Sequence, residues 1–217
     1  RPRLADAEFF FKLDLNTSID SRLDSLKSIV YQKQLGTVHD KSQRIAKLSK
    51  TLAETLDLGS PSLAYRAGEI CKSDLTSKMV FEFPEVQGFM GTHYALHEQE
   101  DAEVANAISE HYKPKGLDDS LPTTAIAQAV ALADKLDTLV GIFGIGQKPK
   151  GDKDPFALRR AVLGIVKIVL RYNINLNLRE AIVQAANNYP EGVLTNLGLI
   201  SDLLEFFHNR IENLFVD

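Results

Sequence analysis

A chain of 217 residues is long enough to bury a large core, and 44% hydrophobic with 25% charged residues is the composition of an ordinary globular protein. A formal net charge of −4 excludes a general nucleic-acid coat or a basic membrane binder, so any polyanion contact must be regional. The single cysteine, Cys71, excludes an internal disulfide and a cysteine-rich zinc site, which predicts a reducing, cytoplasmic location. No apolar run approaches the roughly 20 residues of a membrane helix, and the start at Arg1 without a Met indicates a piece of a longer chain.

The first half of the chain predicts helices separated by glycine and proline. A run of three phenylalanines favours a helix over residues 6–15, although the same composition also suits a strand. Apolar residues at helical spacing predict a second helix that runs from Ile19 past Val30 and stops at Gly36. Pro84 forces a bend after Phe83. The other helices of this half are expected over 45–56, 63–70, 85–96 and 104–111.

The second half opens with the most apolar segment of the chain. Pro122 introduces a stretch from Ile126 to Val140 with a broad buried face, which we expect to be the central helix. Further helices are predicted over 158–171, 178–189 and 197–215. No segment alternates with period two between hairpin turns. The sequence therefore predicts an all-α bundle, one helical domain over 1–217 with a possible C-terminal subregion over 174–217.

A basic loop follows the central helix. The loop and the start of the next helix carry five basic and two acidic residues, a local excess of three positive charges on a chain that is negative overall. The basic residues are Lys148, Lys150, Lys153, Arg159 and Arg160, and the acidic ones are Asp152 and Asp154. Asp154 followed by Pro155 predicts an N-cap and a proline at the first helical position.

Glycines and lysines in this loop suggest a phosphate cradle, but the motifs for one do not match. Gly146 and Gly151 have the spacing of a Walker loop, yet Asp152 stands where the phosphate-binding lysine is needed. A basic loop that contacts a nucleic-acid backbone suits the charge better, because lysine and arginine displace counterions without reading bases. The alternative is a solvated loop that precedes a well-capped helix.

Scattered histidines and acids resemble the metal site of the HD phosphohydrolase superfamily, in which a metal held between helices activates water. His39 lies where the leading histidine is expected, Asp134 in ALADKLDTL lies where the final aspartate is expected, and His111 is a further candidate ligand. The adjacent His-Asp pair is missing, because Ser73-Asp74 stands in its place. Without that imidazole, tight binding of a divalent metal is not expected, although a surviving phosphohydrolase is a rival interpretation.

Two more groups have simpler interpretations. His93 and His97 lie four apart, a spacing that suits a metal, but no third ligand accompanies them. The acids at the HD-like positions are expected to cap helices or pair with basic residues. These acids are Asp74, Asp134 and Asp137, and their candidate partners are Lys78, Lys135 and Arg44.

Several long strings identify a narrower family. DAEFFF, LGTVHDKSQRI, MVFEFPEVQGFMGTHYA, LADKLDTLVGIFGIG and KGDKDPFALRR occur in the order found in bacterial-type glycyl-tRNA synthetase β subunits, so the chain resembles their HD-like helical region. The resemblance implies part of an α2β2 enzyme that joins glycine to tRNA(Gly) with ATP and Mg. It places the activation site on the α subunit and an anticodon-binding domain after residue 217, and it implies no cofactor in this segment.

The resemblance also assigns roles. The HD-like positions His39, Ser73, Asp74, His111 and Asp134 would be vestigial and non-catalytic. The loop cations Lys148, Lys150, Lys153, Arg159 and Arg160 would contact tRNA phosphates. A purely structural scaffold without tRNA contact is the alternative.

Overall fold

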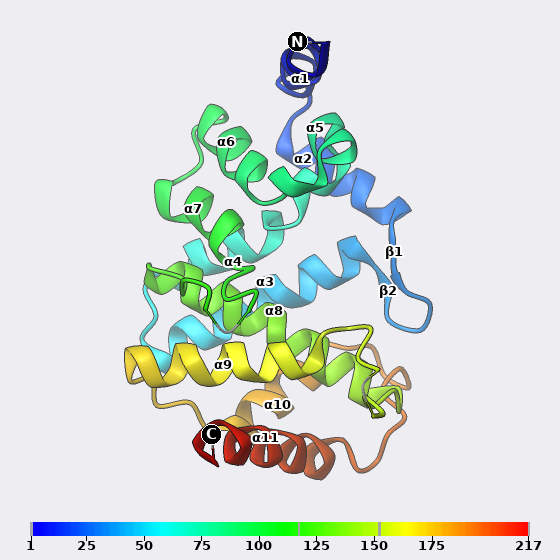
Figure 1. Cartoon of the computed structure of the whole chain (residues 1–217), viewed down its shortest axis with the longest axis vertical. Helices are drawn as coiled ribbons and strands as arrows, with labels where there is room; N and C mark the ends of the chain where they lie inside the picture. Colours follow the sequence, from blue (N-terminus) through cyan, green and yellow to red (C-terminus); the bar gives the residue numbers. More distant parts are fainter. Residues whose placement is uncertain (1, 117, 152, 217) are drawn as a thin grey trace.

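The apolar helix α8 (Ala125–Gly144) lies at the centre of a computed structural model that describes residues 2–116, 118–151 and 153–216 (Figure 1). Almost all of its residues are buried, as expected for a helix that is hydrophobic on every side. It packs against α3 (Val38–Leu56), α4 (Pro61–Ile70), α7 (Ala102–Glu110) and the helices that follow it. The prediction of a central helix after Pro122 is confirmed.

A second layer of short helices covers the N-terminal end of the molecule (Figure 1). It comprises α1 (Pro2–Asp14), α2 (Ile19–Ser25), α5 (Lys78–Glu82) and α6 (Phe89–His97), with 3-10 turns over Ser73–Thr76 and Pro84–Val86. Asp14 ties this layer together, since its carboxylate accepts hydrogen bonds from the backbone of Lys78 and Met79 and from the hydroxyl of Tyr94, each at 2.7–2.9 Å.

The C-terminal helices complete the bundle below α8. These are α9 (Leu158–Tyr172), α10 (Leu178–Ala186) and α11 (Leu199–Val216). Ile182 of α10 and Phe207 of α11 belong to the same apolar core as α8. The mostly helical class is confirmed. Within the described residues, none of the helices combines the length and the apolar character needed to cross a membrane.

The helix predicted from Ile19 to Gly36 is wrong in its second half. Helix α2 ends at Ser25, a 3-10 turn follows over Leu26–Ser28, and β1 (Val30–Gln32) pairs antiparallel with β2 (Gly36–Thr37). Apolar spacing continues through this segment, but the β-branched Ile29 and Val30 also suit a strand. The Gln32 side chain accepts hydrogen bonds from the backbone of Gln34 and Leu35 and fixes the turn.

Helix α6 also begins later than predicted. Pro84 starts a 3-10 turn, and Gly88 adopts φ +83 before α6 begins at Phe89. The bend expected at Phe83-Pro84 is confirmed, since α5 ends at Glu82. The segment therefore breaks twice, at Pro84 and at Gly88, before α6 begins.

Candidate functional site

Two lysines and two aspartates form a buried charge cluster between α3, the turn after α4, and α8. Lys41 Nζ lies 3.0 Å from Asp134 Oδ1 and 2.9 Å from Asp137 Oδ2. Lys72 Nζ lies 3.1 Å from Asp134 Oδ2, so this carboxylate faces two ammonium groups. Burial works against ionisation, but Lys72 and Lys41 outweigh it and hold the pKa of Asp134 well below its usual range.

Arg44 extends the cluster toward the C-terminal helices. Its Nε lies 2.7 Å from Asp137 Oδ1, and its guanidinium stacks over the ring of Tyr189 at 4.1 Å from the centroid. The Tyr189 hydroxyl in turn donates to the Asp137 carbonyl at 2.8 Å. Arg44, one of the candidate cationic partners of the acids, therefore pairs with Asp137.

His111 closes the other side of the cluster in the neutral form. Its Nε2 lies 2.8 Å from Lys72 Nζ, which can only donate, so this nitrogen accepts. The proton then sits on Nδ1 and is donated to the Ile108 carbonyl at 2.7 Å. Burial, followed by repulsion from Lys72, holds the pKa of His111 well below its usual value.

The cluster does not suit a divalent metal. Both carboxylate oxygens of Asp134 face ammonium groups, and the ring nitrogen of His111 that could ligate a metal accepts a hydrogen bond from Lys72. A metal would have to displace both lysines and would face their repulsion. Among the described residues, no group of three or more histidine, cysteine or acidic side chains is placed to hold a metal. The absence of a stoichiometric metal stays a prediction for metal analysis.

The predicted HD-like residues are only partly brought together. His111 and Asp134 lie 4.0 Å apart. Asp74, by contrast, caps α6, because one of its oxygens accepts hydrogen bonds from the backbone of Gly88 at 2.6 Å and Gly91 at 3.1 Å. Burial raises the pKa of Asp74 despite these donors. Of the two roles expected for Asp74, a helix cap or a partner of a basic residue, the structure shows the cap.

The other residues considered for a metal site, Ser73, His39, His93 and His97, make no polar interaction with the buried charge cluster in the described chain. Ser73 is buried in the turn after α4. His39 is half-buried in the first turn of α3. His93 and His97 are exposed on α6, and His93 packs its ring edge-on against Phe89.

Sequence reasoning missed Lys41 and Lys72 and named Lys135 only as a candidate partner of the acids. Lys135 pairs with no carboxylate in the described chain. Its ammonium donates to the carbonyls of His111 at 3.2 Å and Lys113 at 2.9 Å. A usable signal was present, since Asp134 and Asp137 are three apart on an otherwise apolar helix and buried carboxylates need cationic partners.

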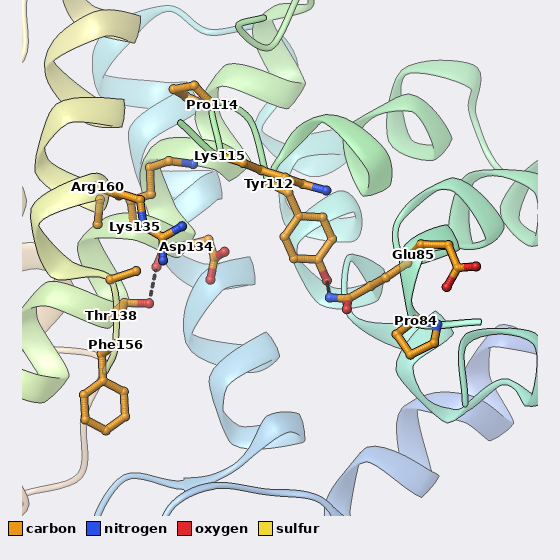
Figure 2. A pocket seen from close by; sticks show the side chains of 13 residues that line it. Pro84, Glu85, Tyr112, Pro114, Lys115, Asp134, Lys135, Thr138, Phe156 and Arg160 are labelled. Atoms are coloured by element: carbon orange, nitrogen blue, oxygen red, sulfur yellow. Dashed lines mark hydrogen bonds between the residues drawn. The ribbon is translucent and has the colours of Figure 1, made fainter. Parts of the chain in front are cut away.

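A pocket of about 480 Å³ opens beside this cluster (Figure 2). Asp134, Lys135 and Thr138 of α8 line one side, and Arg160 of α9 and Tyr112 face the same space. Burial lowers the pKa of Lys135 to about 8, although Asp134 raises it in part. The Tyr112 hydroxyl accepts a hydrogen bond from Gln87 at 2.7 Å, which links this wall to the turn before α6.

The basic loop lies next to the pocket, and two of its three exposed lysines make no ion pair with a described residue. Lys150 and Lys153 exchange backbone hydrogen bonds at 3.0 and 3.2 Å around Gly151, whose φ is +52. Both lysines are exposed. Lys148 differs, because its ammonium lies 2.7 Å from Asp202 of α11. Asp152 lies outside the described residues.

The helix predicted over 158–171 is confirmed as α9, but the prediction of Asp154 as its N-cap with Pro155 as the first helical residue is wrong. Helix α9 begins at Leu158, after Ala157 in the left-handed conformation at φ 55. Asp154 nevertheless acts as a cap from a distance, since its two oxygens accept from the backbone of Leu158 at 2.8 Å and Arg159 at 3.0 Å. The Arg159 side chain donates to the Gly151 carbonyl, and Arg160 is exposed.

Comparison with known proteins gives one family. The model of a family described as glycyl-tRNA synthetase beta subunit matches residues 1–217. The glycine–tRNA ligase beta subunit of Alteromonas mediterranea is 51% identical over 217 residues, which are 100% of this chain and 31% of that protein. Those of Colwellia psychrerythraea and Proteus mirabilis are 51% and 49% identical, each over 97% of this chain and 30% of the relative. The chain thus spans about a third of the length of the curated relatives it matches.

Proposed function

The chain belongs to the family of glycyl-tRNA synthetase beta subunits, and we propose that it is a helical, tRNA-binding and non-catalytic part of such a subunit. The whole protein would join glycine to tRNA(Gly) with ATP and Mg, in an α2β2 assembly in the cytoplasm whose activation site lies on the α subunit. The 31% coverage of the relatives leaves room for further domains, including one that reads the anticodon.

The observation that carries this proposal is the unneutralised charge around the start of α9. In the described part of the chain, no ion pair joins Lys150, Lys153 or Arg160 to a carboxylate, while the chain as a whole is negative. Arg159 is held toward the same loop through Gly151. Exposed cations of this kind bind phosphates through counterion release and do not select a base sequence. Lys148 is the weakest member of the set because Asp202 already neutralises it.

We further propose that the helical body has an HD-like architecture whose metal site is degenerate. Two observations support this: Ser73-Asp74 replaces a His-Asp pair, and the ammonium groups of Lys41 and Lys72 face the Asp134 carboxylate. Lysine at these places supplies the positive charge that the buried acids need, without a Lewis acid or an activated water. His39, His111 and Asp134 would then serve packing and charge balance.

Binding of tRNA(Gly) by the full-length protein over a salt series tests the proposed role of the loop. The variant Lys148→Ala, Lys150→Ala, Lys153→Ala should bind more weakly, and its slope of log K against log salt should fall by roughly 0.9 for each phosphate that the loop no longer neutralises. A matched control removes three exposed lysines elsewhere: Lys12→Ala, Lys27→Ala and Lys50→Ala. Equal affinity and slope for the two variants would show that the loop does not bind tRNA.

The rival phosphohydrolase predicts stoichiometric Mn, Fe or Zn in the purified protein and turnover of a phosphoester. A scaffold predicts neither metal nor any effect of the loop variant on tRNA. Metal analysis beside the salt series therefore distinguishes the three interpretations.

A further inference from the structure

The pocket beside α8 gathers three cationic side chains from three separate segments (Figure 2). Lys135 comes from α8, Arg160 from α9, and Lys115 from the segment after α7. The carboxylates on the wall are Glu85 and Asp134. Asp134 is already matched by Lys41 and Lys72 behind the wall, which leaves Glu85 as the other carboxylate against three cations.

Lys135 is the cation of this pocket that the fold buries and holds in place. Only 8% of it is exposed, and its two hydrogen-bond acceptors are the neutral carbonyls of His111 and Lys113. An ammonium group has three donors, so one remains for a ligand. Gly164 of α9 makes room for the chain, because a Cβ there would come 2.7 Å from Lys135 Cε. A buried ammonium without a carboxylate partner is costly, and a bound anion would offset that cost.

Arg160 and Lys115 are free to reach the same ligand. Arg160 is exposed, and in the described chain it makes neither an ion pair nor a hydrogen bond. The Lys115 ammonium is also exposed and lies 5.7 Å from the centroid of the Tyr112 ring, with no ion pair among the described residues. A guanidinium presents a planar fork of donors, which matches two phosphate oxygens at once.

We infer that this pocket binds a phosphate group through Lys135, Arg160 and Lys115. The volume of about 480 Å³ accommodates a nucleotide as well as a bare phosphate, and Tyr112 and Phe156 are among the residues that line it. Phe156 also lines a separate hollow whose wall includes Lys148, Lys150 and Lys153, so the pocket and the basic loop are neighbours. The phosphate comes either from the backbone of RNA or from a free nucleotide. The RNA source rests on the proposed function, whereas the free nucleotide does not.

Calorimetric titration of the full-length protein with inorganic phosphate, AMP and tRNA(Gly) tests this site. Lys135→Met keeps the length of the side chain, removes its charge, and should weaken the ligand that binds by at least about tenfold. Lys115→Ala and Arg160→Gln are surface changes that keep the test valid if Lys135→Met fails to fold. Lys50→Met, on exposed α3 surface, is the matched control and should change nothing.

Each outcome decides the inference. Loss of AMP or phosphate affinity in the three pocket variants supports a free-nucleotide site, and loss of tRNA affinity alone supports an RNA backbone site. Pocket variants that bind all three probes like the Lys50→Met control overturn the inference, and so does a wild-type protein that binds none. If the wild type binds AMP but no tRNA, and the pocket variants lose AMP binding, the proposed function fails while the phosphate site stands. The loop variant with three alanines should retain AMP binding.

Discussion

Lys41 and Lys72 lie in the interior with carboxylate oxygens at 2.9–3.1 Å, whereas Lys150 and Lys153 lie exposed on the loop before α9 and make no ion pair with a described residue. The interior pair holds α3 and the turn after α4 against α8, so those lysines stabilise the bundle. The loop pair is left available to an external anion. Lysine thus stabilises the fold in one region and is available for binding in the other. The difference is whether a neighbouring helix places a carboxylate beside the ammonium group.

Removing an interior carboxylate should reduce the free energy of unfolding more than any other change proposed for these two regions. Asp137→Ala leaves the ammonium of Lys41 and the guanidinium of Arg44 buried without this partner. We expect a loss of about 3–5 kcal/mol in the free energy of unfolding, measured by urea denaturation. Asp118→Ala, which removes an exposed acid, is the control and should stay within about 0.5 kcal/mol. Similar midpoints for the two variants would contradict a structural role for the cluster.

Lys135, the buried lysine of the pocket, should make the free energy of unfolding depend on pH in the alkaline range. The folded pKa of Lys135 is lowered to about 8 from 10.5, mainly by burial, so the unfolded chain binds more protons between these values. Stability should therefore rise with pH across this window, by about 3 kcal/mol relative to Lys135→Met. Unfolding curves in phosphate-free buffer between pH 7.5 and 10.5 measure the difference. Parallel curves for wild type and variant would show that Lys135 is not perturbed.

His111 should make stability depend on acid pH. Its folded pKa lies well below 6.5, because burial and Lys72 disfavour the charged form, so below pH 6.5 the unfolded chain takes up a proton that the folded chain refuses. The stability is fully present above that pH and should be lost progressively as the pH falls below 6.5. His111→Gln should flatten this part of the curve. An equal decline in the variant would assign the acid sensitivity to another group.

The loop should contribute least to stability. Changing Lys148, Lys150 and Lys153 to Ala removes one partly exposed ion pair, Lys148 with Asp202, and two solvated charges. The change in the free energy of unfolding should stay within about 1 kcal/mol, measured by urea denaturation as for Asp137→Ala. A destabilisation comparable to that of Asp137→Ala would mean that the loop is structural and would remove the contrast between the two regions.

Local sequence signals were enough for most of the bundle. Apolar spacing and the breaks at Gly59, Pro61 and Pro122 predicted α3, α4 and α8, because these patterns depend on residues within a turn of each other. They failed at Val30, where β-branched residues suit a strand as well as a helix, and at Asp154, which caps α9 from four residues before its first residue. The long motif strings indicated the family, which the match over residues 1–217 confirms.

The sequence by itself determined the helical bundle, the central helix and the basic loop, since each depends on composition or on neighbours along the chain. Only the tertiary structure decided which charges are partnered. Lys41 and Asp137 are 96 positions apart, and Lys72 and Asp134 are 62 apart, so no local pattern joins them. The packing of α3 and the turn after α4 against α8 brings them within 3.1 Å and excludes water, and the same packing leaves Lys135 at the wall of a pocket.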